Sequence, residues 1–202
     1  MTNKSELIFL FAHGAGGDMD SEWMVSMDNL LSERKIQVVR FNFPYMIKRA
    51  EDGKRRPPDR QPKLLEAFKA EIESLPEDVK IVIGGKSMGG RMASLLACDP
   101  EYSDRIASVV CMGYPFHPPG KPEKFKGEHL ASITVPTLIL QGERDTFGTR
   151  DEMADWEFSD KVKQCFLPDG DHSFKPRKKS GLTLEENMER AANAIASFIS
   201  ET

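Results

Sequence analysis

Six short runs of apolar and β-branched residues are spread along the chain, and most of them end at a cluster of glycine, proline or acidic residues. Short runs with so few polar positions are typical of strands that are buried on both faces of a parallel sheet. The six predicted strands are residues 7–12, 37–41, 80–83, 106–112, 136–141 and 163–167.

The segments between these strands place apolar residues at helical spacing. The predicted helices are residues 21–34, 62–75, 91–97, 149–158 and 184–199. Thr183 and Glu186 form the pattern of a capping box at the start of the last helix. Alternating strands and helices predict an α/β protein with a doubly wound, mostly parallel six-stranded sheet flanked by helices. No repeat or linker interrupts the pattern, so we expect one domain over residues 1–202.

Two stretches depart from this pattern because basic residues and prolines replace the apolar positions. Residues 48–63 hold seven basic and three acidic residues, for a net charge of +4, and residues 175–179 add four basic residues. A charge run is usually a solvated loop, and we expect a loop over 48–63.

The segment Gly84–Gly90, with the sequence GGKSMGG, joins the third strand to a helix. Gly-x-Ser-x-Gly between a strand and a helix is the signature of a nucleophile elbow, where a serine on a strained turn projects above the sheet edge. Side chains at Gly85 and Gly89 would collide with the neighbouring strand and helix. Ser87 is therefore the predicted nucleophile, and the Met88 N–H can face a developing oxyanion. The alternative is a glycine-rich turn with an incidental serine.

A second glycine-rich loop, His13–Gly17, directly follows the first strand. Glycines there let backbone N–H groups approach a ligand closely. We expect Ala15, or else Gly16, to supply the second donor of an oxyanion hole, and His13 to orient the loop. The alternatives are a plain turn and a phosphate-binding loop, but no third glycine at the dinucleotide spacing and no Gly-Lys-Ser/Thr follows.

A serine nucleophile needs a base, and the base needs an acid that orients it. When these groups lie on the loops of a parallel sheet, a common order along the chain is serine, acid, histidine. Of the four histidines, only His172 lies beyond both Ser87 and an acid at a strand end. Asp145, in a Gly-x-x-Asp turn after the fifth strand, is the predicted acid. Its rivals in nearby segments are Asp151, Asp169 and Asp171.

Composition narrows the function further. A net charge of -4 and the lack of aromatic residues within the basic stretches disfavour nucleic-acid binding. The three cysteines have no metal-ligand spacing, so we expect buried, reduced thiols in a cytoplasmic protein, without a metal or a cofactor. The apolar run over residues 7–12 is too short for a signal peptide or a membrane span.

With these motifs, the sequence resembles the α/β-hydrolase superfamily over nearly its whole length. It is most similar to the small branch that includes dienelactone-hydrolase-like proteins, testis-expressed homologues and a subunit of the nonspecific-lethal chromatin complex. The segments that carry the resemblance are His13–Gly17, Gly85–Arg91, Gly113–Gly120, Gln141–Asp145 and Gly170–His172. The resemblance implies a minimal α/β-hydrolase fold with Ser87 as nucleophile, Asp145 as acid, His172 as base, and Met88 and Ala15 as oxyanion-hole donors.

Two departures from larger relatives bear on the substrate. The two strands that usually precede the oxyanion loop's strand are absent from the prediction, and little sequence after residues 106–112 is available for a lid. We therefore expect a shallow, open site that disfavours long-chain lipids. Lys86, before the nucleophile, is unusual for the superfamily; we consider it a charged structural partner and assign it no chemistry.

These features predict an enzyme that hydrolyses an ester, thioester or related acyl bond of a small molecule through an acyl-enzyme. The alternative is a binding or scaffold module with little turnover and a protein partner, as the resemblance to a chromatin-complex subunit implies. Because both basic stretches follow strands at the edge that carries Ser87, we also expect a substrate bearing carboxylate or phosphate. The predicted substrate-binding residues are His117, Lys178 and Lys179. If both stretches instead point away from the site, they are ordinary solvated loops.

Overall fold

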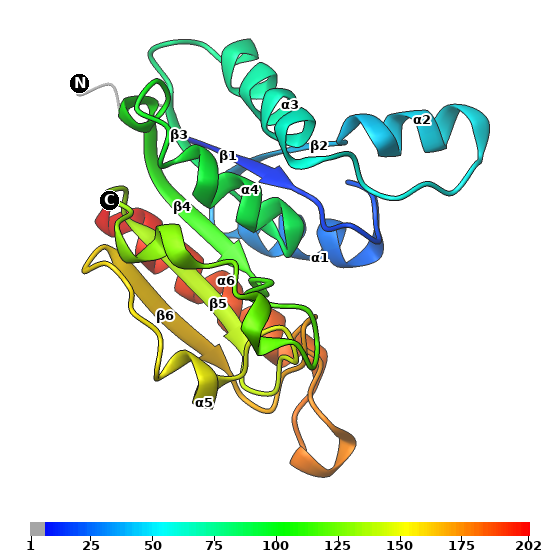
Figure 1. The fold of residues 1–202 in the computed structure, drawn as a ribbon, viewed down its shortest axis with the longest axis vertical. Helices are drawn as coiled ribbons and strands as arrows, with labels where there is room; N and C mark the ends of the chain where they lie inside the picture. Colours follow the sequence, from blue (N-terminus) through cyan, green and yellow to red (C-terminus); the bar gives the residue numbers. More distant parts are fainter. Residues whose placement is uncertain (1–6) are drawn as a thin grey trace.

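All six apolar runs form strands, and the strands lie side by side in one parallel sheet (Figure 1). The computed structural model describes residues 7–202. The strand order is β2-β1-β3-β4-β5-β6, which confirms the doubly wound α/β prediction. The strands are β1 Leu7–Ala12, β2 Gln37–Phe41, β3 Lys80–Lys86, β4 Ile106–Met112, β5 Thr137–Gly142 and β6 Val162–Leu167.

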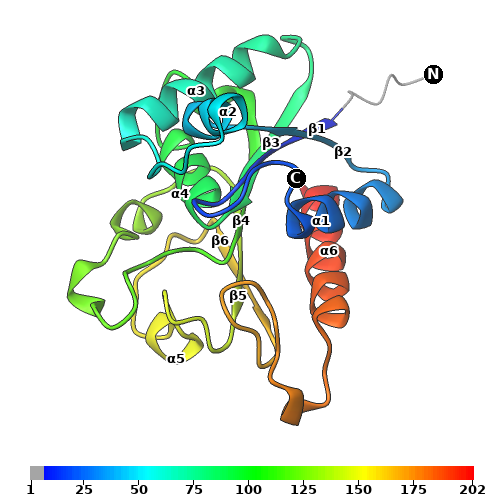
Figure 2. The same ribbon diagram turned by 90° about the vertical axis from the view of Figure 1, so that its right-hand side faces the viewer.

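Helices cover both faces of the sheet (Figure 2). The helices are α1 Glu22–Glu33, α2 Pro44–Asp52, α3 Gln61–Ser74, α4 Met88–Leu96, α5 Arg150–Met153 and α6 Leu184–Glu201. Short 3-10 turns lie at η1 Ser103–Arg105, η2 Pro122–Lys124, η3 Glu128–Ala131 and η4 Lys178–Ser180. Helices α1 and α6 pack on one face, whereas α3, α4 and α5 pack on the other.

Each face of the sheet has its own hydrophobic core, because successive side chains of a strand point to opposite sides. In β1, Phe9 and Phe11 pack toward α1 and α6, while Leu10 and Ala12 pack toward α3 and α4. All four side chains are fully buried. Burial of one such large apolar side chain contributes about 1.5–3 kcal/mol, so a central strand that is apolar on both faces is strongly fixed in place.

The register of β1 and β3 places the two glycine-rich segments side by side. Ala12, the last residue of β1, pairs with Gly85 of β3. Strand β1 also lies where the winding of the chain reverses, since β2 is on one side of it and β3 on the other. Ligands of open α/β sheets bind at the carboxyl ends of the strands at this point. The fold therefore places the candidate ligand-binding site at the loop after Ala12 and the turn after Lys86.

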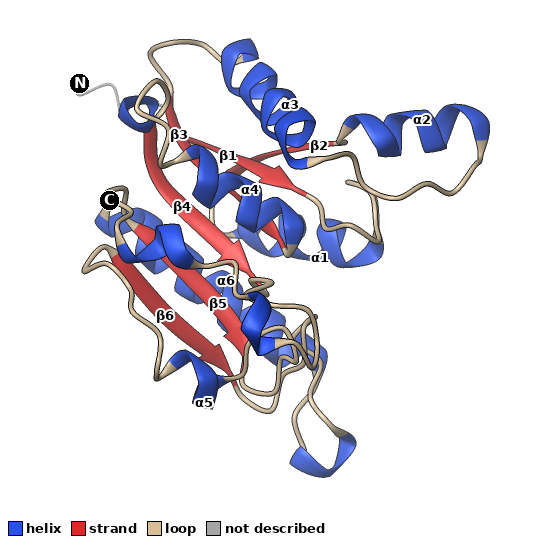
Figure 3. Cartoon of the chain, in the orientation of Figure 1, coloured by secondary structure: helices blue, strands red, loops and turns tan. Residues whose placement is uncertain are grey.

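Residues 48–52 were expected in a loop, but they belong to α2 (Figure 3). This helix buries Tyr45 and Met46 in the core next to α3 and ends at Gly53, whose φ of 70° is left-handed. The charged residues occupy its outer side, so a charge-rich sequence concealed an amphipathic helix.

The helix predicted over residues 149–158 ends after Met153. The physical reason is an aromatic cluster beyond it, in which Trp156 and Phe158 both contact the ring of Phe116. Strand β3 is longer than predicted and includes Gly84. A Cβ at Gly84 would lie 2.2 Å from the carbonyl oxygen of Val110, so glycine is needed for the close approach of β4.

Other expectations concern the end of the chain and the cysteines. The capping box of Thr183 and Glu186 is confirmed at the start of α6.

All three cysteines are free thiols: Cys111 is buried and Cys165 is half-buried. Cys98 is exposed, contrary to expectation, because α4 ends at Leu96 and the chain turns outward. None of the helices in residues 7–202 combines the length and the apolar character needed to cross a bilayer.

Candidate active site

Ser87 lies between β3 and α4 in a backbone conformation that few residues adopt, with φ 51° and ψ −114°. Such strain costs about 1–3 kcal/mol and is concentrated at functional sites. A Cβ at Gly85 or at Gly89 would lie 2.4 Å from the carbonyl oxygen of Ala12, which confirms the predicted collision. Glycine at both positions therefore lets the turn pack against the end of β1 and presents Ser87 at the carboxyl edge of the sheet.

Three polar side chains meet at this edge. Nε2 of His172 lies 2.9 Å from Oγ of Ser87, and Nδ1 of His172 lies 2.8 Å from Oδ2 of Asp145. Asp145 is fully buried, whereas His172 keeps 24% of its side chain exposed. The three residues follow β3, β5 and β6, so the sheet brings together segments that are distant in sequence. In this geometry a proton can pass from the hydroxyl to the imidazole, while the carboxylate fixes the imidazole tautomer.

The rival acids make other contacts. Oδ1 of Asp171 accepts hydrogen bonds from the backbone N–H groups of Ser173 and Lys175, at 2.8 and 3.0 Å. Asp169 pairs with Arg177, and the hydrogen bond from that guanidinium is the main reason that the pKa of Asp169 falls to about 2. Asp151 is exposed on α5. Asp145 is the acid that the structure brings to His172.

Gln141 is a residue of the site to which the sequence assigned no role. It is fully buried, and its Nε2 donates to Oδ2 of Asp145 at 2.9 Å. Its Oε1 accepts the N–H of Tyr114 at 2.7 Å, so the amide is held in one orientation. The N–H of Phe147 donates to the other oxygen of Asp145 at 2.9 Å. The signal in the sequence is an amide side chain directly after the apolar run Leu138–Leu140, four positions before Asp145.

The loop after β1 lies beside Ser87. A Cβ at Gly14 would lie 3.6 Å from Cβ of Ser87, which shows how closely the two segments approach. Within residues 7–202, the N–H groups of Ala15 and of Met88, the first residue of α4, have no hydrogen-bond acceptor. The Tyr45 hydroxyl donates to the carbonyl oxygen of Ala15 at 3.1 Å and holds the loop from α2. Two free donors are thus available near the serine hydroxyl.

His13 holds the same loop in place through a buried hydrogen bond. Its Nε2 accepts the N–H of Phe43 at 3.0 Å, and its ring is fully buried. Burial lowers the pKa of His13, which favours the neutral ring that this hydrogen bond requires. The contact agrees with the expected orienting role.

An open cleft of about 410 Å³ lies over Ser87. Its residues come from the loop after β1, from α1, from the turn after β3 and from the loops after β5 and β6. They are Gly14, Ala15, Gly16, Gly17, Ser21, Trp23, Met24, Lys86, Ser87, Phe147, His172 and Ser173. The ring of Phe147 packs against that of His172, with centroids 4.2 Å apart. The cleft is mainly apolar and fits a small ligand.

Lys86 forms part of the cleft wall and was not assigned a function from sequence. Its Nζ donates to the carbonyl oxygen of His172 at 2.8 Å and lies 4.8 Å from the ring centroid of Trp23. Burial lowers the pKa of Lys86 to about 8, although the charges of Asp145 and Asp171 act in the opposite direction.

The structure does not bring the predicted substrate-binding residues to the cleft. The side chain of His117 is only 3% exposed; its Nδ1 faces the carbonyl oxygen of Pro118 at 3.0 Å and its Nε2 lies 3.2 Å from Glu152. The ring is therefore enclosed between its own loop and α5. Lys178 and Lys179 are exposed in η4, outside the residues that line the cleft.

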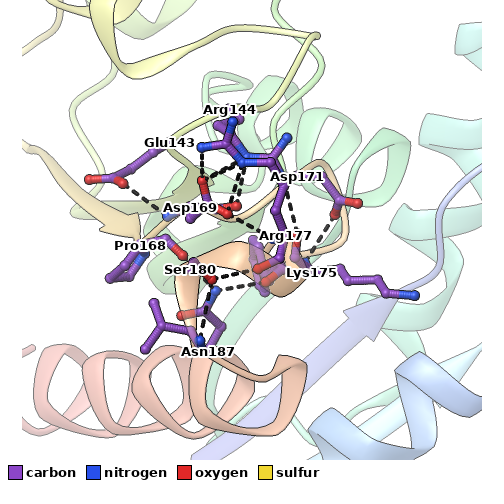
Figure 4. Close-up of polar contacts among 11 residues, drawn as sticks. Glu143, Arg144, Pro168, Asp169, Asp171, Lys175, Arg177, Ser180 and Asn187 are labelled. Carbon is purple, nitrogen blue, oxygen red and sulfur yellow. Dashed lines mark hydrogen bonds and ion pairs between the residues drawn. The ribbon is translucent and has the colours of Figure 1, made fainter.

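Polar contacts fix the loop that carries His172 (Figure 4). Asp169 pairs with Arg177 within the loop, and Arg144 donates to the carbonyl oxygen of Asp169 at 2.8 Å from the end of β5. Asn187, fully buried on α6, donates to the carbonyl oxygens of Pro168 and Phe174 at 3.0 and 2.8 Å. The histidine is thus held from both its own loop and two neighbouring elements. In the described part of the chain, no group of three or more potential ligands could hold a metal ion.

The fold and the site geometry together define the class of protein. Residues 5–200 match the family described as an alpha/beta hydrolase domain, and the chain belongs to this family.

Solved structures of similar fold extend the comparison. A dienelactone hydrolase from Anabaena variabilis is 17% identical, with a TM-score of 0.73 over 98% of this chain and 88% of that chain. Est1E from Butyrivibrio proteoclasticus, with ferulic acid bound, is 18% identical, with a TM-score of 0.69 over 97% of this chain and 90% of that chain. An alpha-beta serine hydrolase homologue from Coxiella burnetii is 20% identical, with a TM-score of 0.69 over 95% and 87%. At these identities the likeness establishes the fold.

Proposed function

We propose that this α/β hydrolase cleaves an ester, thioester or related acyl bond of a small molecule through an acyl-enzyme on Ser87. The observation that carries the proposal is the hydrogen-bonded chain from Oγ of Ser87 through His172 to the buried carboxylate of Asp145. The similarity in fold to a dienelactone hydrolase and to Est1E supports the acyl-hydrolase class.

In the first half of the proposed reaction, Nε2 of His172 takes the hydroxyl proton as Oγ of Ser87 attacks the acyl carbon. The negative charge moves to the carbonyl oxygen, where the N–H groups of Ala15 and Met88 donate hydrogen bonds. The bond to the leaving oxygen or sulfur then breaks, and His172 returns its proton to that atom. Asp145 stays ionised and stabilises the imidazolium that forms.

In the second half, a water molecule replaces the leaving group. His172 takes a proton from the water as its oxygen attacks the acyl carbon, and the same two N–H groups hold the oxyanion. The bond to Oγ breaks, the proton returns to Ser87 and the carboxylic acid leaves. One water is consumed and one acyl bond is cleaved per turnover. The openness of the cleft favours short acyl groups over long lipid chains.

A fluorophosphonate probe tests the nucleophile directly, since Oγ forms a bond to phosphorus while fluoride leaves. We expect one label per wild-type chain and none in the Ser87→Ala variant. Turnover of a panel of short esters and thioesters should fall by about 10⁴- to 10⁶-fold in that variant. Ser173→Ala is the matched control, because Ser173 lines the same cleft and its hydroxyl makes no hydrogen bond to His172 in the described chain.

Two outcomes would contradict the proposal. Unchanged labelling of Ser87→Ala would place the nucleophile elsewhere. A folded wild-type protein that neither labels nor turns over any panel substrate would favour a binding or scaffold module with a protein partner.

Our proposal includes a cytoplasmic location, which the free thiols at all three cysteines support.

A further inference from the structure

Lys86 places an ammonium group in the wall of the cleft, next to the serine on which the proposed function rests. An ammonium has three N–H donors, and in residues 7–202 the Nζ of Lys86 has a single hydrogen-bond acceptor, the carbonyl oxygen of His172 at 2.8 Å. A second contact is the face of the Trp23 ring, 4.8 Å away. The remaining donor capacity has no partner in the described chain.

The charge of Lys86 also lacks a direct counterion. Among the cleft-lining residues, it is the one lysine, and neither arginine, aspartate nor glutamate is present. Asp145 and Asp171 act on it through space, but neither forms an ion pair with it in the part of the chain that the structure describes. A half-buried cation without a paired anion is costly, and an anionic ligand would offset that cost.

We infer that Lys86 forms a subsite for a carboxylate on the substrate, and that the natural substrate is a short acyl compound with a carboxylate a few atoms from its scissile bond. The inference rests on the proposed function, and it adds the substrate class. The apolar faces of Trp23 and Phe147 line the remainder of the cleft and accommodate the short carbon chain.

The pH dependence provides an independent signature. Three titratable groups lie on elements around Nζ: Asp145 after β5, and Asp171 and His172 after β6. The two carboxylates favour the ammonium, whereas burial disfavours it and lowers the pKa of Lys86 to about 8. Lys86 is therefore mostly charged at pH 7, and the preference for an anion should fall by about tenfold from pH 7 to pH 9.

Two pairs of esters that differ by one charge measure this preference. Monomethyl succinate and methyl levulinate carry the carboxylate or a neutral ketone on the acyl side, and acetoxyacetate and acetoxyacetone carry them on the leaving-group side. We expect wild-type kcat/KM to favour the anion in at least one pair. In Lys86→Met the anionic member should lose about 10- to 100-fold more than its neutral partner, the range for a hydrogen bond to a charged group.

A second variant separates charge from support of the loop. Lys86→Gln keeps a side-chain N–H donor but has no charge, so the ratio of kcat/KM for the anionic ester to that for its neutral partner should fall, whatever loss the two esters share. Competitive inhibition of neutral-ester turnover by succinate gives a binding measurement, and it should weaken in both variants and above pH 8 in the wild type. Lys178→Gln with Lys179→Gln is the surface control and should weaken succinate inhibition far less than either Lys86 variant.

The outcomes distinguish the two proposals. If the wild type turns over neutral esters but Lys86→Gln changes both members of each pair equally, Lys86 only supports the His172 loop and the carboxylate subsite is refuted. If succinate inhibition is unaffected by both Lys86 variants, the subsite is likewise refuted. If no ester reacts and Ser87 does not label, the proposed function fails, and succinate binding by calorimetry to wild type but not to Lys86→Gln would still support the subsite.

Discussion

Asp145 and Asp171 carry the same functional group near one histidine, and their hydrogen bonds separate their roles. Asp145 is enclosed by donors: the imidazole, the Gln141 amide and the N–H of Phe147. Asp171 accepts backbone N–H groups from its own loop. The first arrangement requires a charged acceptor opposite His172, whereas the second requires only an oxygen.

At the scale of single residues, the matched substitutions Asp145→Asn and Asp171→Asn test this difference between the two carboxylates. We expect Asp145→Asn to lower kcat by about 10²- to 10⁴-fold, because an amide N–H₂ facing Nδ1 favours the wrong tautomer of His172. Asp171→Asn keeps Oδ1 as an acceptor and should change kcat only slightly. Steady-state kinetics on a short ester measures both. A larger loss in Asp171→Asn would mean that the acid has been misassigned.

At the scale of elements, the site depends on how closely β1, β3 and α4 approach each other. Gly89 lies in the first turn of α4, and a Cβ there would lie 2.4 Å from the carbonyl oxygen of Ala12 and 2.8 Å from that of His13. Both obstacles are backbone atoms at the end of β1, which cannot move without shifting the loop that follows this strand. The helix and the loop are therefore fixed as one unit.

This contact predicts the sign of a glycine substitution. Helix propensity alone would make Gly89→Ala stabilising by about 1 kcal/mol, but the clash should make it destabilising by about 1–3 kcal/mol. Gly16→Ala is the control, because no atom lies within 4 Å of its added Cβ, and it should change stability by less than about 0.5 kcal/mol. Urea unfolding gives both values. A stabilised Gly89→Ala protein would refute the close packing.

At the scale of the whole molecule, the two basic stretches combine paired and unpaired charges. Several of their charges are paired locally, as in Arg56 with Asp52, Lys63 with Asp59 and Arg177 with Asp169. Arg49 on α2 lines a hollow that shares Gly16, Gly17 and Ser21 with the cleft. The remaining charge acts at a distance, on the encounter with a charged substrate.

Salt should therefore affect the charged substrate selectively. We expect kcat/KM for monomethyl succinate to fall as ionic strength rises, with a Debye length of about 10 Å at 0.1 M, while the value for methyl levulinate stays nearly constant. Lys178→Glu combined with Lys179→Glu should reduce this difference. Equal salt dependence of the two esters would show that the basic stretches are ordinary solvated surface.

Global stability should depend on a half-buried histidine outside the site. Burial lowers the pKa of His129 to about 4, with the nearby charge of Arg91 acting in the same direction, and its Nε2 lies 2.8 Å from Oγ of Ser94. The unfolded chain binds this proton more readily, so stability is lost as pH falls from about 6.5 toward 4.

We predict that the free energy of unfolding decreases between pH 6.5 and 4.5 with a slope of up to about 1.4 kcal/mol per pH unit from this group. His13, whose pKa burial also lowers, adds to the slope. In His129→Gln the slope should be smaller, because glutamine does not titrate. Urea titrations at several pH values provide the measurement, and an unchanged slope in the variant would contradict the assignment.

The sequence by itself determined the features that local pattern and chain order encode. Apolar runs specified the strands, the glycines around Ser87 specified the turn, and the order of serine, strand-end aspartate and late histidine selected Asp145 and His172 from several candidates. These predictions needed no side-chain contact between distant segments, because a parallel sheet brings all strand ends to one edge.

Tertiary structure decided what depends on contacts between segments that are far apart in the sequence. Gln141 acquires its role only where β5 meets the loops at Tyr114 and Asp145, and His117 is enclosed because its loop folds against α5. Lys86 is a charged residue at the end of β3, and only the carbonyl oxygen of His172 and the ring of Trp23, both distant in sequence, define its environment. A side chain's charge and partners depend on what surrounds it in space, which the one-dimensional pattern does not contain.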